Sequence, residues 1–213
     1  MSITFNQLLQ LVGRLDDQPG FDSPRERFRR FLTEEVIDLQ FAAGLVDAGQ
    51  HALGEQAHRA LQDVLVILGR FLGFETAFGT YQRADGTARH HGLWRSRRRL
   101  TVILDLFTDQ TPRSDFDDLS RELAALAREA RLDTEAETIG VCVVTPLFPW
   151  RQRLEAMLAA QMDAADRRVV TASSLLALAA LVTEGEVRHE EIVQLMTASS
   201  TCLLYTSPSP RDS

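Results

Sequence analysis

Two neighbouring histidines precede an apolar run that holds one acidic residue, and a second acidic residue follows that run. The four residues are His90, His91, Asp105 and Asp109. Imidazole and carboxylate groups both bind zinc or manganese, so either acid together with a histidine would suit a small metal site. Successive strand residues point to opposite faces, which allows only one of the two histidines to face inward. We favour the alternative that one histidine is exposed and the other is hydrogen-bonded in the core.

The densest group of cations comes directly after these histidines and consists of Arg95, Arg97, Arg98 and Arg99. Arginine forks match phosphate oxygens, so the group is a candidate nucleic-acid-binding patch. The alternative is a solvated hairpin turn that the acids at 115–118 balance. The net charge of −7 and the pI near 5.3 argue against a protein that coats nucleic acid non-specifically.

Several chemistries lack their residues in this chain. All 23 basic residues are arginine, so every mechanism that needs a lysine is excluded. The sequence has no glycine-rich phosphate loop, no zinc-type Cys/His spacing and no Gly-x-Ser-x-Gly motif. Two cysteines suggest no disulfide framework, and no signal peptide or membrane span is recognisable, so we expect a cytoplasmic protein. We expect His51 and His58 to lie at the surface.

The spacing of apolar residues predicts the elements that would position these side chains. Helices are expected over 3–16, 24–46, 54–72, 115–132, 150–162 and 189–196, and over a segment that Ser173 or Ser174 caps and that runs to Val182. Strands are expected over 74–81, 91–95, 100–107, 139–145 and 168–171. Residues 100–107 carry one charge among apolar side chains, as a central strand buried on both faces does. The fold class is α/β, with a mixed sheet of about five strands flanked by helices behind two or three N-terminal helices.

Separated motifs in a fixed order resemble a restriction-endonuclease-like family. Residues 58–81 are similar to a helix ending in "GRxLGFEVexGxY", and 91–94 to a "DGLW" strand. Residues 139–144, 167–181 and 187–192 are similar to that family's "LGLYVVGR", "LRIVSVESLLSLAEL" and "VSHEDIL". The resemblance covers roughly 58–196 and implies the PD-(D/E)xK fold, whose Asp and Glu hold a divalent metal for phosphodiester hydrolysis.

The catalytic positions that the resemblance implies are degenerate in this chain. The Asp of "DGLW" falls on His91. The family's next strand reads "VVEVKTTDAY", and its Glu and Lys fall on Leu104 and Leu106 when Thr108-Asp109 is aligned with the "TD" that follows them. A supporting helix Glu falls near Ile67. Sliding the strand alignment by one residue gives Asp105 in place of the Glu but Phe107 in place of the Lys. Leucine cannot ligate a hard cation, which demands oxygen ligands. We therefore predict no catalytic residues, with Asp105 and Asp109 as the fallback pair.

The expected function is that of a catalytically inactive nuclease-fold protein that acts as an interaction or assembly module without a cofactor. The apolar content of the first two helices predicts a protein partner or homo-oligomer there, and no membrane is expected. One alternative is a DNA endonuclease with a rearranged site, dependent on Mg²⁺ or Mn²⁺. The other is a non-cleaving nucleic-acid binder that uses the Arg95–Arg99 patch.

Three segments are expected along the chain: a helical N-terminal section at 1–50, the α/β domain at 51–198, and a disordered tail at 202–213. The tail sequence CLLYTSPSPRD, at 202–212, matches a common transposon-based sequencing adapter translated in frame. We interpret it as an artefact of a reading frame that ran into adapter sequence, and we leave it out of fold reasoning.

Overall fold

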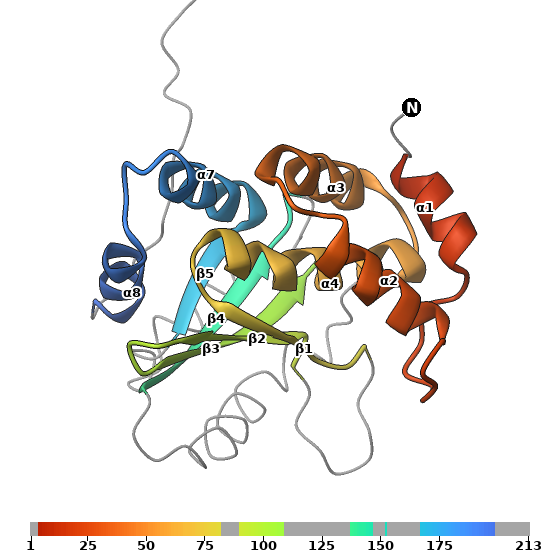
Figure 1. Ribbon diagram of the computed structural model, residues 1–213, viewed down its shortest axis with the longest axis horizontal. Helices are drawn as coiled ribbons and strands as arrows, with labels where there is room; N and C mark the ends of the chain where they lie inside the picture. The colour runs from red at the N-terminus through yellow and green to blue at the C-terminus, as the bar shows by residue number, and fades with distance from the viewer. Residues whose placement is uncertain (1–3, 82–89, 109–136, 147–151, 153–166, 199–213) are drawn as a thin grey trace, which may run out of the picture.

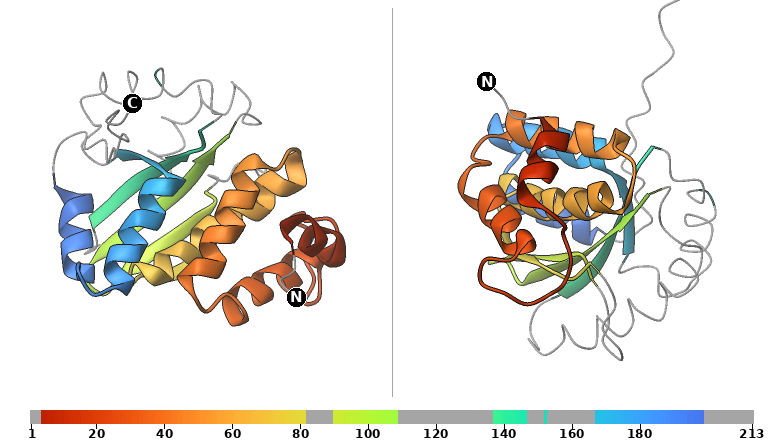
Figure 2. Two further views of the ribbon diagram at one scale, coloured as in Figure 1. Left: turned by 90° about the horizontal axis from the view of Figure 1, so that it is seen from above. Right: turned by 90° about the vertical axis from the view of Figure 1, so that its right-hand side faces the viewer.

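The computed structural model describes residues 4–81, 90–108, 137–146, 152 and 167–198. These residues form a five-stranded sheet in the order β1-β2-β3-β4-β5, with six helices gathered mainly on one side of it (Figures 1 and 2). Sequence predictions for helices at 115–132 and 150–162, and for the tail at 202–213, fall on segments outside the described residues. No helix among the described ranges is long and apolar enough to cross a membrane.

The sheet combines an antiparallel meander with a parallel half. The strands are β1 (Glu75–Phe78), β2 (Gly92–Ser96), β3 (Leu100–Phe107), β4 (Glu137–Val144) and β5 (Arg167–Thr171). Pairing is antiparallel from β1 to β3 and parallel from β3 to β5. Every residue of β3 is buried, which confirms its prediction as the central strand. The mixed sheet and the helices that precede it confirm the expected fold class.

Helix α4 (Glu55–Phe71) is the central helix of the domain. It packs against β1, β2, β3 and four other helices, and it is buried on most sides. Gly73 ends it in the left-handed region at a φ of 88°, where a Cβ would lie 2.8 Å from His189 Nδ1. Where α4 crosses β2, a Cβ on Gly92 would lie 2.2 Å from Val66 Cγ2. This close approach brings the start of β2 directly under α4.

The N-terminal section contains α1 (Phe5–Val12), α2 (Pro24–Glu34) and α3 (Leu39–His51). The prediction of one helix over 24–46 was wrong, because the chain breaks after Glu34 and begins again at Asp38. The Asp38 carboxylate caps α3 by accepting a 2.7 Å bond from the Phe41 amide. The side chains of Asn and Asp can bond nearby backbone amides and so compete with the hydrogen bonds of a continuous helix. This competition separates α2 from α3, although their apolar residues follow one helical pattern.

The C-terminal helices are α7 (Ala172–Thr183) and α8 (His189–Thr197). Thr171 caps α7 by accepting a 3.0 Å bond from the Ser174 amide, so the predicted cap at Ser173 or Ser174 was wrong by two or three residues. The error arose because β5 runs into α7 without a loop, and its last residue serves as the cap. Helix α7 packs against α3 and α4 and completes the layer over the sheet (Figure 2).

Candidate functional site

The positions that the resemblance assigned to the catalytic Glu, Lys and helix Glu are occupied by core side chains. Leu104, Leu106 and Ile67 are all buried within the hydrophobic core. Gly92 pairs with Leu104 across the β2–β3 ladder, and a Cβ on Gly92 would meet Val66 of α4. Leu104 therefore lies under α4, and the side-chain alternation of a strand puts Leu106 on the same face. None of the three supplies an oxygen ligand.

His91, at the position of the family's Asp, is buried between α4 and β3. Its backbone amide donates to the Leu104 carbonyl at 3.0 Å. Its Nδ1 lies 2.8 Å from the Asp105 Oδ1 and 2.8 Å from the Leu106 amide nitrogen. When Nδ1 carries the proton it donates to Asp105, and when it does not it accepts from Leu106. On the other side of the ring, Nε2 lies 2.7 Å from Gln62 Nε2.

A second histidine approaches the same glutamine. His58, one helical turn before Gln62 on α4, places its Nε2 2.9 Å from Gln62 Nε2 and its Nδ1 2.9 Å from the Thr108 hydroxyl. The two imidazole rings stand edge to face, with centroids 6.1 Å apart. We call His58, Gln62, His91, Asp105 and Thr108 the α4–β3 cluster. His58 was expected at the surface, and that prediction was wrong because the helix turns this residue toward the end of β3.

The metal-site and fallback predictions have different outcomes in this geometry. The structure brings His91 to Asp105, whereas Asp109 lies outside the described residues. Phe107, the Lys position of the shifted alignment, is buried. The described ranges contain no group of three His, Cys, Asp or Glu side chains arranged to hold a metal. Mg²⁺ requires several oxygen ligands, and the α4–β3 cluster offers one carboxylate, so its residues do not fit the family's Mg²⁺ site.

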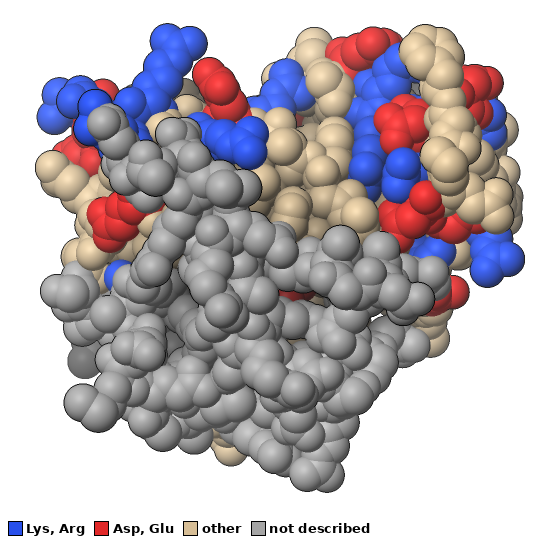
Figure 3. Space-filling model, turned by 90° about the horizontal axis from the view of Figure 1, so that it is seen from below, with Lys and Arg blue, Asp and Glu red and all other residues tan. Residues whose placement is uncertain are grey.

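The arginine patch lies at the turn between β2 and β3. Arg95, Arg97, Arg98 and Arg99 are all exposed, and Arg99 takes a φ of 60° in the turn. Acidic side chains flank the patch: Arg97 Nε lies 3.7 Å from Glu75, and Arg98 Nη2 lies 3.2 Å from Glu190 of α8. Over the described part of the face in Figure 3, basic and acidic residues are likewise intermixed. The described acids come from β1 and α8, and the acids at 115–118 that were expected to balance the turn lie outside the described residues.

Glu190 responds electrostatically to this neighbourhood. A backbone hydrogen bond and the Arg98 guanidinium lower the pKa of Glu190. The carboxylate therefore stays charged over the range in which it would oppose a phosphate ligand. The patch is best described as four exposed arginines with an acidic border.

A second polar cluster joins the N-terminal helices to the α/β domain. Arg29 of α2 makes a two-pronged contact with Asp63 of α4, at 2.9 and 3.1 Å, and donates to the Gly79 carbonyl at 2.9 Å. The Tyr81 hydroxyl donates to the same carboxylate of Asp63. Asp63 is fully buried, and the Arg29 side chain is 10% exposed. Charge-assisted, bidentate bonds of this kind are the strong ones in proteins.

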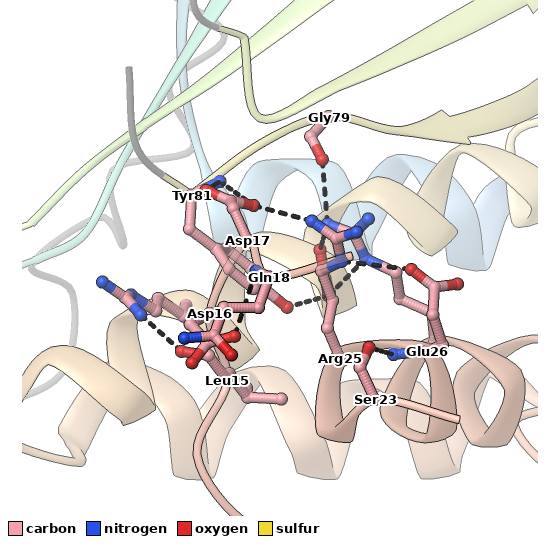
Figure 4. Close-up of polar contacts among 12 residues, drawn as sticks. Leu15, Asp16, Asp17, Gln18, Ser23, Arg25, Glu26, Gly79 and Tyr81 are labelled. Atoms are coloured by element: carbon pink, nitrogen blue, oxygen red, sulfur yellow. Dashed lines mark hydrogen bonds and ion pairs between the residues drawn. The ribbon is translucent and has the colours of Figure 1, made fainter. Parts of the chain in front are cut away.

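Asp17 extends this cluster to the connection between α1 and α2. Its carboxylate accepts from the Tyr81 amide at 2.9 and 3.1 Å and from Arg25 at 2.9 Å (Figure 4). We call Asp17, Arg25, Arg29, Asp63 and Tyr81 the N-terminal cluster. Because it links residues far apart in sequence, it holds α2 against α4 and the end of β1.

Burial dominates the titration of the N-terminal cluster. Burial raises the pKa of Asp63, while Arg29 and the Tyr81 hydroxyl act in the opposite direction. Burial alone would lower the pKa of Arg29, but the Asp63 carboxylate more than reverses this, so that pKa is raised. Burial and the negative charge of Asp63 together raise the pKa of Tyr81 above its ordinary value. The tyrosine hydroxyl therefore remains a donor in the folded protein.

The apolar content of the N-terminal helices, which suggested a partner, is largely used within the chain. Ten apolar side chains of the described residues 4–50 are buried in the common core: Phe5, Leu8, Val12, Leu15, Phe28, Leu32, Val36, Ala42, Leu45 and Val46. Large apolar side chains that remain exposed are Leu11, Phe21, Ile37 and Leu53.

Comparison with known proteins gives structural matches only. No protein-family model matches the chain, and no curated protein matches it. The solved structure of restriction endonuclease FokI superposes with a TM-score of 0.54 at 12% identity, covering 80% of this chain and 32% of the FokI chain. A structure of FokI bound to DNA gives a TM-score of 0.47 at 13% identity, covering 82% of this chain and 32% of the other. The chain thus spans about a third of the enzyme that it resembles in fold.

Proposed function

We propose that this chain, which has a restriction-endonuclease-like fold, is a catalytically inactive member of that architecture and works as an interaction or assembly module. One observation carries the proposal: Leu104 and Leu106 pack in the core, while His91 makes hydrogen bonds within the protein. A nuclease of this type needs oxygen ligands at these places to hold a metal and activate water. Within the described ranges, the carboxylate beside His91 is that of Asp105.

The surface of the N-terminal section is where we expect the partner or second copy to bind. The exposed large apolar side chains of this section are Leu11 of α1 and Phe21, Ile37 and Leu53, which lie in the three successive connections from α1 to α4. Binding would bury those four side chains, and each buried aliphatic or aromatic side chain contributes about 1.5–3 kcal/mol before the entropic costs of association. A clean monomer in light scattering, with no retained partner in affinity capture through the full chain, would contradict this part of the proposal.

Catalytic inactivity is tested by incubating the purified protein with supercoiled plasmid and Mg²⁺ or Mn²⁺. We expect no nicking or linearisation above that of a metal-chelated control. Metal-dependent cutting that disappears in Asp105→Ala would overturn the proposal and support the rearranged-site endonuclease instead. Asp22→Ala is the matched control, because Asp22 is exposed and lies in the N-terminal section away from the α4–β3 cluster.

A second candidate is a non-cleaving nucleic-acid binder. The observation that favours it is the exposure of four arginines on one turn, with the Arg97 side chain 93% exposed. Phosphate binding by such a patch should weaken as salt rises, with a slope set by the number of contacts. A gel-shift affinity unchanged by both salt and the triple variant Arg97→Ala, Arg98→Ala, Arg99→Ala would rule this candidate out.

A further inference from the structure

Two imidazole nitrogens converge on a single buried atom in the α4–β3 cluster. His58 Nε2 and His91 Nε2 lie 2.9 and 2.7 Å from Gln62 Nε2, and they approach it from α4 itself and from the residue preceding β2. Gln62 is 1% exposed, and His91 is buried as well. Two nitrogen donors that face one interior point form an arrangement that a metal ion can occupy.

The other nitrogen of each ring already has an oxygen neighbour. His91 Nδ1 faces the Asp105 carboxylate at 2.8 Å, and His58 Nδ1 faces the Thr108 hydroxyl at 2.9 Å. When a histidine ligates a metal through Nε2, its Nδ1–H is commonly donated to a carboxylate or another oxygen, which fixes the ring and raises its basicity. His58 has this surrounding, and His91 has it in the arrangement in which its Nδ1–H donates to Asp105. In the alternative arrangement His91 Nδ1 accepts from the Leu106 amide at 2.8 Å, so metal binding through Nε2 requires the first one.

Gln62 provides an independent observation at the same point. Its Oε1 is buried and lacks a hydrogen-bond partner among the residues that the structure describes. A buried polar atom left without a partner costs about 1–3 kcal/mol. Turning the amide places Oε1 between the two rings, where it could accept from imidazole N–H groups or bind a cation. The side chain therefore contributes an oxygen to the point on which the two nitrogens converge.

We propose that His58, His91 and Gln62 form a binding site for a Zn²⁺-like transition-metal ion, with the two Nε2 atoms and Gln62 Oε1 as ligands. Zn²⁺–N bonds are about 2.0–2.1 Å long. For an ion at the present place of the amide nitrogen, each ring moves by less than about 1 Å, and the Gln62 side chain withdraws by about 2 Å so that Oε1 becomes a ligand instead of filling the point. Imidazole selects zinc and its neighbours over Mg²⁺, which prefers oxygen. The fourth position of the tetrahedron is left for water.

This site is independent of the proposed loss of nuclease activity. It uses two α4 side chains together with His91, which stands at the position of the family's Asp, and its role is to tie α4 to the start of β2. The binding free energy of a structural zinc ion adds to the stability of the folded state. Zinc should therefore raise the midpoint of thermal unfolding.

The test is equilibrium dialysis of the untagged, chelator-treated full chain against Zn²⁺, with Co²⁺ as a visible-absorption probe of imidazole ligation. We expect one ion per chain, and a loss of binding of at least tenfold in His58→Ala. Asp105→Asn, which alters the oxygen partner of His91 Nδ1, should weaken binding by about tenfold, because the carboxylate that orients the ligating ring is lost. Gln62→Glu replaces the amide oxygen with a carboxylate of the same shape and should tighten binding.

His51→Ala is the matched control, because His51 is exposed and contacts the carbonyl of Asp47 on its own helix. Binding in this variant should equal that of the unmodified chain. His58 is only half-buried and Gln62→Glu preserves side-chain volume, so these variants are expected to fold, which circular dichroism would verify. The proposal is overturned if no stoichiometric Zn²⁺ binds, or if neither His58→Ala nor Gln62→Glu changes the affinity. The cluster would then be a hydrogen-bonded network with the Gln62 amide turned.

Discussion

Gln62 and Asp63 are consecutive residues of α4, both fully buried, and they serve two different polar clusters. Asp63 faces the N-terminal helices, where Arg29 and Tyr81 satisfy both of its carboxylate oxygens. Gln62 faces the start of β2 and the end of β3, where its nitrogen has two imidazole neighbours and its oxygen has no hydrogen-bond partner among the described residues. Two adjacent positions on one helix thus differ in how completely their polar groups are paired.

The difference separates a structural cluster from a candidate binding site. In the N-terminal cluster, every strong donor that faces Asp63 is matched, and removing one member leaves a charge buried. In the α4–β3 cluster, the amide can turn, and His91 Nδ1 has two alternative partners, the Asp105 carboxylate and the Leu106 amide. Fully satisfied polar networks make a fold rigid. The α4–β3 cluster is incompletely satisfied, because Gln62 Oε1 has no hydrogen-bond partner among the described residues. We therefore expect mutations in the N-terminal cluster to affect stability more.

The largest effect is expected for Asp63→Ala. The variant leaves the Arg29 guanidinium buried without its carboxylate, and arginine cannot lose its charge in a protein. Breaking a buried pair in this way costs about 3–5 kcal/mol of unfolding free energy. Urea unfolding followed by circular dichroism would measure it. Asp22→Ala removes exposed ion pairs with Arg27 and Arg30 and should change stability little, and an equal loss in both variants would refute the comparison.

Tyr81→Phe should have the next largest effect, about 1.5–3 kcal/mol, because it removes a hydrogen bond to a charged group. The folded state holds the Tyr81 proton above the ordinary tyrosine pKa of about 10. Its stabilising contribution is therefore complete below that pH and is lost as pH rises through the raised pKa. An alkaline absorbance titration should show no phenolate signal from Tyr81 before unfolding. Below the pH of unfolding, the absorbance titration of the unmodified protein should therefore equal that of Tyr81→Phe. An extra phenolate signal near pH 10 in the unmodified protein would contradict the raised pKa of Tyr81.

Gly92→Ala tests the close approach that places His91 under α4. The new methyl group would meet Val66 Cγ2 at 2.2 Å, and overpacking of this kind costs about 1–3 kcal/mol. Gly44 of α3 is exposed, with nothing within 4 Å of an added Cβ, so Gly44→Ala is the matched control. The control should gain about 0.5–1 kcal/mol from the better helix propensity of alanine. A neutral result for Gly92→Ala would mean that β2 and α4 are not held this closely.

Asp105→Asn should have the smallest effect on the metal-free protein, about 0.5–1.5 kcal/mol. The amide keeps an oxygen that can accept from His91, and the Leu106 amide offers the imidazole a second neighbour. Denaturant unfolding of both proteins without metal would measure the difference. A loss as large as that of Asp63→Ala would remove the distinction between the two clusters.

Local patterns in the sequence were sufficient for the sheet and for most helices. The run from Leu100 to Phe107 has the composition of a strand buried on both faces, and the structure confirms these bounds. The break between α2 and α3 was missed because Val36 is apolar and buried like a helix residue, while the deciding contact is the Asp38 cap. A cap of this kind ends one helix and starts another even where the spacing of apolar residues continues without a break.

The two clusters were harder to predict, because their partners meet only in the folded chain. His58 and Gln62 are one turn apart on a helix, a spacing visible in the sequence, but nothing local brings His91 to them. Arg29 and Asp63 are similar: each has oppositely charged neighbours in sequence that would have served as surface partners. The long-range pairing of β2 under α4, set by Gly92 and Val66, decides which of these local options is realised.

The absence of the family's hard-cation site is tested most directly by the effect of Mg²⁺ on unfolding. A ligand that binds only the folded state at 100 times its dissociation constant adds about 2.7 kcal/mol, which a thermal midpoint registers clearly. The unfolding midpoint in millimolar Mg²⁺ should equal that in Na⁺ of the same ionic strength. A Mg²⁺-dependent rise that Asp105→Ala abolishes would contradict the account, because it would show a working oxygen site where His91 and the leucines stand.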